Sequence, residues 1–282
     1  MIILNTAQEM HDWSTRAWAK GQQIGFVPTM GALHEGHASL MRAAVAENNG
    51  AVLSIFVNPA QFAPHEDFGR YPRTFDADCA LADDLGVAAV YAPAAEAMYP
   101  PDYSSYVEVG GVSEGLCGAS RPHFYRGVCT VVTKLFNAVK PHRAYFGQKD
   151  AQQTAVIRRM VRDLDMDIEI IEMPIVREAD GLAMSSRNRY LSPEERERAL
   201  ALSRSLQIAR TAMADGERDA DTLITQVREA LEPVRVDYVA LVDTVTMEPV
   251  TTIKQPVLLA IAAYVGNTRL IDNIKFIPPD AH

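Results

Sequence analysis

The chain has 282 residues, of which 48% are hydrophobic and 22% are charged, as is typical of a globular protein. Its formal net charge of −9 argues against nucleic acid as a partner, because binding a phosphate backbone requires a basic surface. The three cysteines are widely spaced and form no C-x-x-C pair, so neither a disulfide framework nor a zinc site is predicted. No apolar run approaches the ~20 residues that span a bilayer, and the first five residues have no signal-peptide features. These properties predict a soluble, cytoplasmic protein with no membrane partner.

Helical and strand patterns alternate through residues 1–176. The predicted helices are 6–20, 38–48, 75–85, 127–139 and 152–164, and the predicted strands are 24–27, 51–57, 87–91, 143–146 and 168–171. This order predicts an α/β fold with a mostly parallel, Rossmann-like sheet and right-handed crossovers. Ligands of such sheets bind beyond the carboxyl ends of the strands.

The pattern changes after Pro174, where a polar, glycine-containing stretch precedes Ser192-Pro193, a typical helix start. The predicted helices that follow are 193–214 and 220–231, and the predicted strands are 236–242, 257–265 and 270–277. We therefore predict two domains, 1–176 and a smaller α/β domain at 177–282.

The most informative segment follows the strand 24–27 and contains two histidines three residues apart. It runs Met30-Gly31-Ala32-Leu33-His34-Glu35-Gly36-His37. Unpaired N–H groups at a helix start favour an anion, and the imidazoles of His34 and His37 can donate to a phosphoryl oxygen. The alternative is a helix with two solvated histidines. The position between strand and helix favours a phosphate site.

A second group of polar residues follows two later strands. Gly147-Gln148-Lys149-Asp150 ends the strand 143–146, where a lysine can hold a phosphate and an aspartate a ribose hydroxyl. The amides of Gln61 and Gln153 could together recognise a small hydroxy acid, although either alone is more often an ordinary surface residue. No glutamate or aspartate occurs in 121–149, which contains six basic residues, so a local anion site is a further hypothesis.

Residues Met184-Ser185-Ser186-Arg187 combine two hydroxyls with a guanidinium beyond Gly181. Such a loop suits a mobile clamp on triphosphate oxygens. The alternative is a serine-rich linker between domains. Together with the histidine pair, the loop favours an enzyme in which a carboxylate or phosphate attacks the α-phosphate of ATP.

With these residues identified, the sequence resembles the pantothenate synthetase (pantoate–β-alanine ligase) family from residue 24 to residue 273. The H-x-G-H motif alone would indicate only the wider nucleotidylyltransferase superfamily. The matching segments are 28–37, 54–59 with Gln61-Phe62, 71–74, 134–136, 147–150 with Gln152-Gln153, 180–188 and 269–273.

The resemblance implies that pantoate and β-alanine are condensed with Mg-ATP through a pantoyl adenylate, giving pantothenate, AMP and pyrophosphate. It implies that His37 is catalytic and that Gln61 and Gln153 bind pantoate, with Gln61 also facing β-alanine. It assigns ATP binding to 30–37, 147–150, the backbone at Val176, and 184–187. It also implies a homodimer. No protein ligand for a metal is assigned.

Two departures from the family pattern concern His123, which is shifted by one position and receives no role, and Gln148, which replaces a glutamate. Two other functions remain open at this point. A nucleotidylyltransferase could use the same phosphate motifs, and a non-catalytic ATP- or RNA-binding module is disfavoured by the acidic balance and the two amides.

Overall fold

The computed structural model describes residues 1–64 and 66–279. Contacts divide the chain into two compact units. Unit 1 comprises Met1–Val109, Arg121–Gly147 and Val156–Pro174, and unit 2 comprises Gly110–Ser120, Gln148–Ala155 and Ile175–His282. Among the described residues, no helix has the length and apolar character needed to cross a membrane.

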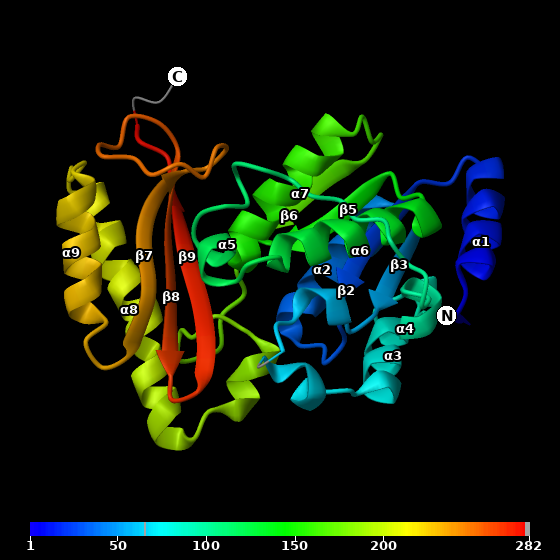
Figure 1. Cartoon of the computed structure of the whole chain (residues 1–282), viewed down its shortest axis with the longest axis horizontal. Helices are drawn as coiled ribbons and strands as arrows, with labels where there is room; N and C mark the ends of the chain where they lie inside the picture. Colours follow the sequence, from blue (N-terminus) through cyan, green and yellow to red (C-terminus); the bar gives the residue numbers. More distant parts are fainter. Residues whose placement is uncertain (65, 280–282) are drawn as a thin grey trace. The chain divides into compact units, whose positions relative to one another are not determined.

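Unit 1 contains a six-stranded sheet in which every pairing is parallel (Figure 1). In spatial order its strands are β1 (Ile2–Leu4), β4 (Ala89–Tyr91), β3 (Gly50–Ile55), β2 (Ile24–Thr29), β5 (Arg143–Gly147) and β6 (Glu169–Met173). The predicted parallel α/β fold is confirmed. The short edge strand β1 was missed, because three residues are too few for periodicity to indicate a strand.

Helices cover both faces of this sheet. They are α1 (Ala7–Ala19), α2 (Glu35–Glu47), α3 (Phe75–Asp84), α4 (Ala95–Met98), α6 (Phe124–Val139) and, from Val156 onward, α7 (Ala151–Asp163). On one face, Val27, Leu53 and Tyr145 of neighbouring strands pack with Met41 of α2 and Ala82 of α3. On the other, α6 packs beside α1, because Ser14 Oγ donates to the carbonyl of Val139 (2.7 Å) and the ring of Phe26 meets Phe136 edge to face.

The start of α2 differs from its prediction by three residues, since the helix begins at Glu35 with His34 as its N-cap. Histidine is not a common cap, and the apolar periodicity therefore placed the start at residue 38. Both histidines of the H-x-G-H motif consequently belong to the first turn of the helix.

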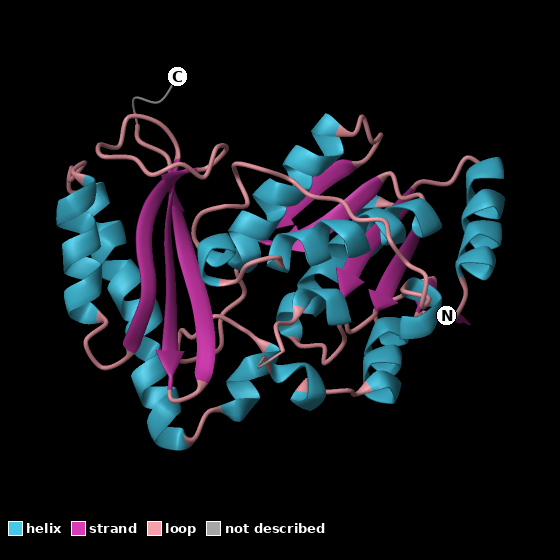
Figure 2. Ribbon diagram, in the orientation of Figure 1, coloured by secondary structure: helices cyan, strands magenta, loops and turns pink. Residues whose placement is uncertain are grey.

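Unit 2 contains an antiparallel sheet with strand order β7-β8-β9 (Figure 2). Its strands are β7 (Arg235–Asp243), β8 (Val257–Val265) and β9 (Thr268–Phe276), and its longer helices are α8 (Pro193–Ala214) and α9 (Ala220–Ala230). The core joins Leu202 and Leu206 of α8, Leu223 of α9, and Leu259 and Ile261 of β8. As predicted, Ser192 caps α8 with Pro193 in its first turn.

Short helical turns carry several predicted site residues. They are η1 (Pro59–Gln61) in unit 1 and η3 (Gln148–Asp150), η4 (Ser186–Tyr190) and α5 (Cys117–Ser120) in unit 2, and η2 (Asp67–Arg70) lies between η1 and α3. The sequence analysis predicted no helix at these turns, because three to five residues show no helical periodicity.

Candidate active site

The site in unit 1 lies where the strand order of the sheet reverses. Strand β2 pairs with β3 on one side and with β5 on the other, and the chain proceeds outward in both directions from there. Segment 30–37 follows the carboxyl end of β2, and Gly147 is the last residue of β5. In open parallel sheets this reversal point is where ligands bind.

The two histidines of segment 30–37 hold each other in place. His34 Nδ1 accepts from the backbone N–H of Gly36 (3.2 Å), and His37 Nδ1 accepts from the N–H of His34 (3.3 Å). The ring centroids lie 4.1 Å apart. Because both Nδ1 atoms accept, each neutral imidazole carries its proton on Nε2. The turn therefore makes Nε2–H the donor of both rings.

Asp78 of α3 binds the backbone of the same segment. Its carboxylate accepts from the N–H groups of Ala32 and Leu33 (2.9 Å each) and from the hydroxyl of Thr74 (3.1 Å). Gly31 has φ +79°, and a Cβ there would lie 2.9 Å from Asp78 Oδ2. The segment thus needs a glycine at this position.

These contacts correct the expectation of unpaired N–H groups at the start of α2. Side chains of the protein already accept from Ala32, Leu33, His34 and Gly36. The side chain of Glu35 is exposed and paired with Arg42 of the same helix, whose guanidinium lowers the pKa of Glu35. The backbone N–H groups of these four residues thus already have acceptors within the protein.

Gln61, the predicted pantoate-binding amide, is oriented by two neighbours in unit 1. Its Oε1 accepts from Asn58 Nδ2 (3.0 Å), and its Nε2 lies 3.1 Å from Met30 Sδ. Asn58 is itself buried and accepts from the hydroxyl of Tyr99 (2.8 Å). Burial raises the pKa of Tyr99, so its hydroxyl keeps the proton that it donates. Asn58 is therefore a positioning residue that the sequence analysis missed.

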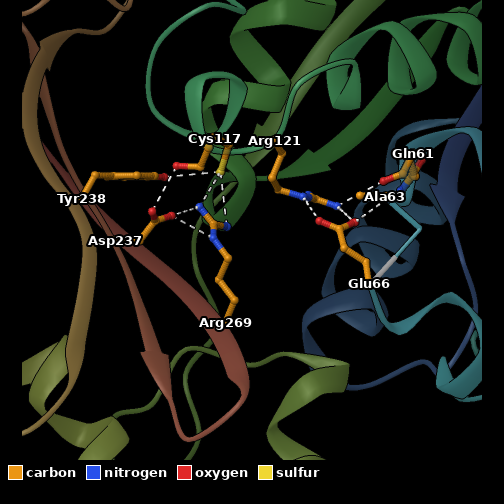
Figure 3. A network of polar contacts seen from close by, with 9 residues as sticks. Gln61, Ala63, Glu66, Cys117, Arg121, Asp237, Tyr238 and Arg269 are labelled. Atoms are coloured by element: carbon orange, nitrogen blue, oxygen red, sulfur yellow. Dashed lines mark hydrogen bonds and ion pairs between the residues drawn. The ribbon is translucent and has the colours of Figure 1, made fainter.

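Helix α6 fixes the backbone of the turn that carries Gln61. Asn58 Nδ2 donates to the carbonyl of Gly127 (3.1 Å), and a Cβ on Gly127 would overlap the carbonyl oxygen of Ala60. On the other side, Arg121 forms a bidentate ion pair with Glu66 (2.6 Å) and donates to the carbonyl of Gln61 (3.1 Å; Figure 3). Two elements therefore fix the position of Gln61.

In unit 2, Asn273 of β9 holds the turn that carries Gln148 and Lys149. Asn273 Nδ2 donates to the carbonyls of Gln148 (2.9 Å) and Lys149 (3.1 Å), and its Oδ1 accepts from Gln148 Nε2 (3.1 Å). A glutamate at position 148 could not donate in this way when ionised. The departure from the family pattern thus completes a hydrogen-bond pair. Asp150, the last residue of η3, lies 3.6 Å from the Lys149 ammonium.

The loop 176–188 is held by buried polar contacts. Arg177 pairs with the buried carboxylate of Asp272 (2.6 and 3.0 Å) and donates to the carbonyl of Gly181 (3.1 Å). The N–H of Met184 donates to the carbonyl of Val176 (3.0 Å), which the sequence analysis had placed in the ATP site.

Several hydrogen bonds hold the loop that is expected to act as a clamp. Ser185 Oγ accepts from the N–H of Arg187 (3.3 Å) and caps η4, and Ser186 and Asn188 are buried. Asn188 Nδ2 donates to Glu178 (2.6 Å) and to the carbonyl of Ala183 (3.1 Å). These contacts fix the backbone that carries Ser185 and Arg187.

The adjacent glutamines at the start of α7 have different surroundings. Gln152 is buried, accepts from the N–H of Cys117 (3.0 Å) and donates to the carbonyls of Val112 (3.1 Å) and Gly115 (2.7 Å). Gln153 is half-buried and has no hydrogen-bond partner among the described residues. The amide predicted to bind substrate is therefore the one that the protein leaves unpaired.

A polar cluster in unit 2 fixes the segment that Gln152 binds. Both terminal nitrogens of Arg269 lie 3.6 Å from Cys117 Sγ, and the guanidinium pairs with Asp237 (2.8 Å; Figure 3). The hydroxyl of Tyr238 lies 3.4 Å from the same sulfur, and burial raises its pKa. These contacts join α5 to strands β7 and β9.

Each unit brings together part of the predicted set: Met30 with Gln61 and His34 with His37 in unit 1, and Lys149 with Ser185 beside one cavity in unit 2. Four basic residues of the stretch 121–149 have partners within unit 1. Arg121 and Arg143 pair with carboxylates, and Arg126 and Lys134 lie over tyrosine rings. His123 is exposed, in a left-handed conformation. The described residues contain no group of three or more potential metal ligands.

Comparison with known proteins identifies the family. Residues 2–275 match the family model described as pantoate-beta-alanine ligase. The chain is 58% identical over 276 residues to a pantothenate synthetase of Thermotoga petrophila, a match that covers 97% of this chain and 99% of that protein. A pantothenate synthetase of Moorella thermoacetica is 55% identical over 281 residues, with coverage of 97% and 98%.

Solved structures agree with these matches. The crystal structure of pantothenate synthetase from Thermus thermophilus superposes with a TM-score of 0.92 at 43% identity, covering 97% of this chain and 99% of that one. The pantoate-beta-alanine ligase from Francisella tularensis, complexed with beta-gamma ATP and beta-alanine, gives a TM-score of 0.79 at 31% identity, covering 99% and 98%.

Proposed function

The chain belongs to the pantoate–β-alanine ligase family, and we propose that it condenses (R)-pantoate with β-alanine, converting ATP to AMP and pyrophosphate. It is thus an AMP-forming acid–amino-acid ligase of pantothenate and coenzyme A biosynthesis. The observation that carries this proposal is the pair of imidazoles of His34 and His37, whose Nδ1 atoms both accept backbone N–H groups at the carboxyl end of β2.

The proposed reaction has two steps. A carboxylate oxygen of pantoate attacks the α-phosphorus of ATP, the bond to the β-phosphate oxygen breaks, and pyrophosphate leaves. The resulting pantoyl adenylate is attacked at its acyl carbon by the neutral amine of β-alanine. AMP then leaves with the electron pair of the broken C–O bond, and the amine proton is lost to solvent. No covalent enzyme intermediate is needed, so alignment and charge stabilisation are the protein's contribution.

We propose that His37 is the catalytic residue, with its Nε2–H donated to the α-phosphate as negative charge develops there. A single donor of this kind typically contributes ~10²–10³-fold to turnover. The proposed ATP-binding residues are Met30, Gly31, Ala32, Leu33, His34, Glu35, Gly36 and His37, then Gly147, Gln148, Lys149 and Asp150, then Val176, Met184, Ser185, Ser186 and Arg187. Glu35 would act through its backbone, since its side chain pairs with Arg42.

Gln61 and Gln153 are proposed to bind pantoate, and Gln61 is also proposed to face β-alanine. Asn58 and Met30 use one acceptor site and one donor of the Gln61 amide, which leaves the second N–H for a ligand. The unpaired amide of Gln153 can recognise a carboxylate or a hydroxyl. The Francisella tularensis ligase, crystallised with beta-alanine, supports the assignment of the amine substrate.

Mg²⁺ is proposed to arrive as part of the substrate Mg-ATP. Mg²⁺ commonly binds through nucleotide phosphates and retains several waters, so it needs few protein ligands. We further propose a cytoplasmic homodimer, with residues 1–176 forming a nucleotide- and pantoate-binding domain and residues 177–282 a smaller lid domain.

Product analysis tests the proposal. With ATP, pantoate and β-alanine, we expect stoichiometric AMP, pyrophosphate and pantothenate, and no AMP when pantoate is omitted. A nucleotidylyltransferase would release pyrophosphate and leave the nucleotide on its product. A non-catalytic module would consume no ATP, so either result would overturn the proposal.

A further inference from the structure

The two polar atoms of the Asn188 side chain in unit 2, Nδ2 and Oδ1, differ in their hydrogen bonding. Its Nδ2 donates to the carboxylate of Glu178 and to the carbonyl of Ala183, which fixes the orientation of the amide. The opposite atom, Oδ1, is buried and has no hydrogen-bond partner among the described residues. The side chain is only 8% exposed. A buried carbonyl oxygen without a donor is costly, and native proteins rarely leave one unpaired.

The same residue lines a small cavity inside unit 2. Its polar lining residues are Lys149, Ser185, Asn188 and Asp272, and the rest of the wall is apolar. The space open to the centre of a water molecule is about 10 Å³, close to what one buried water requires.

Two lining residues have hydrogen-bond donors to spare. The ammonium of Lys149 carries three protons and has one partner in the described part of the chain, the carboxylate of Asp150 at 3.6 Å. The hydroxyl of Ser185 accepts from the N–H of Arg187, and its own proton has no acceptor among the described residues. Asp272 is different, since both of its carboxylate oxygens bind Arg177. The cavity therefore combines one unpaired acceptor with two unused donors.

We propose that one buried water in this cavity donates to Asn188 Oδ1 and accepts from the Lys149 ammonium, which makes Asn188 a positioning residue for Lys149. The second lone pair of that water accepts from the Ser185 hydroxyl, whose proton is otherwise unused among the described residues. Without the water, the long contact to Asp150 is the one ion pair of the ammonium among residues 1–64 and 66–279, and the ammonium is carried on a flexible four-carbon stem. The functional part of this inference rests on the proposed role of Lys149 in ATP binding.

The first test is a crystal structure of the ligand-free protein at a resolution that defines water molecules. We expect one water within hydrogen-bonding distance of Asn188 Oδ1 and Lys149 Nζ. A protein donor on Asn188 Oδ1, or a cavity without a water between these two atoms, would overturn the inference. This readout does not depend on catalysis, so it stands even if the proposed function is wrong.

The second test is a double-mutant cycle on ATP affinity measured by calorimetry. Asn188→Ala should weaken ATP binding roughly tenfold, the effect of losing a hydrogen bond to a charged group, and should have no further effect in a Lys149→Ala background. An equal loss of ATP affinity in the wild-type and Lys149→Ala backgrounds would mean that Asn188 acts independently of Lys149. It would refute the positioning role.

Glu178→Ala is the matched control, because it removes an anchor of Asn188 Nδ2 and leaves Oδ1 in place. If this variant reproduces the whole loss seen with Asn188→Ala, loop anchoring explains the effect and the water does not. If Lys149→Ala itself leaves ATP affinity unchanged, the assignment of Lys149 to the ATP site fails. The crystallographic test then decides the water on its own.

Discussion

The imidazoles of His34 and His37 both accept backbone N–H groups of the first turn of α2 through Nδ1, and their ring centroids lie 4.1 Å apart. His34 accepts from Gly36, and His37 accepts from His34. This arrangement caps helix α2 and fixes both tautomers at once. The structural role and the proposed catalytic role therefore use different nitrogens of the same rings.

His37→Ala should lower the rate of AMP formation by ~10²-fold or more, because one donor to the α-phosphate is lost. Steady-state kinetics with saturating ATP, pantoate and β-alanine measures the effect. His11→Ala is the control, since His11 is half-buried on α1 and, among the described residues, its ring is hydrogen-bonded to the carbonyl of Asn137. A folded His37→Ala enzyme with nearly normal turnover would remove His37 from the mechanism.

Asp78→Asn should both destabilise the protein and weaken ATP binding. An asparagine has one acceptor oxygen, so the N–H of either Ala32 or Leu33 would face an NH₂ group and remain unpaired. Such a loss costs ~1–3 kcal/mol, measurable by urea denaturation, and it loosens segment 30–37. Asp76→Asn, at an exposed position of the same helix, should change neither property. Equal stability of the two variants would show that Asp78 does not hold the segment.

Gly127→Ala should raise the KM for pantoate more than the KM for ATP. The added Cβ would overlap the Ala60 carbonyl oxygen and lie 2.9 Å from the backbone nitrogen of Gln61, so the turn that carries Gln61 must move. Overpacking of this kind costs ~1–3 kcal/mol. Gly69→Ala is the control, because a Cβ there meets nothing within 4 Å. An unchanged pantoate KM in a folded Gly127→Ala enzyme would show that the position of Gln61 does not determine pantoate binding.

Gln153→Ala should change substrate binding and Gln152→Ala should change stability, although the two residues are adjacent. Gln153→Ala should raise the pantoate KM about tenfold to a hundredfold, with the ATP KM and the melting temperature nearly unchanged. Gln152→Ala removes three hydrogen bonds of a buried side chain and should lower the melting temperature. If Gln153→Ala affects both substrates equally, its role is structural.

Hydrogen exchange tests how firmly the loop 184–188 is held. The N–H of Asn188 donates to the carbonyl of Ser185 (3.0 Å), and its side chain anchors the turn, so we expect this amide to exchange slowly before ATP is added. Mass spectrometry of peptides covering 181–188 measures the rate. Fast exchange that slows only with ATP would instead support the mobile clamp expected from the sequence.

In the described part of the chain, periodicity predicted every strand longer than three residues and every α-helix longer than four. It could not predict β1, α4 or α5, which are too short to show a pattern. The antiparallel direction of β7, β8 and β9 was also not specified, because alternation within a strand does not reveal its neighbours.

For the candidate site too, the sequence identified some residues and could not identify others. Residues within short motifs, such as His34 with His37, could be identified from spacing. Asp78 could not, because it reaches the backbone of Ala32 from 46 positions away in the sequence. Asp272 and Asn273 lay within a segment that resembled the family, yet only the structure showed that they hold Arg177 and Lys149.

The proposed attack of pantoate on the α-phosphate is tested most directly by isotope transfer. Pantoate labelled with ¹⁸O in both carboxylate oxygens is incubated with the enzyme, ATP and β-alanine, and the products are analysed by mass spectrometry. We expect AMP that carries one ¹⁸O and pantothenate that retains the other in its amide. Unlabelled AMP, or ADP with labelled inorganic phosphate, would contradict a pantoyl adenylate and with it the proposed mechanism.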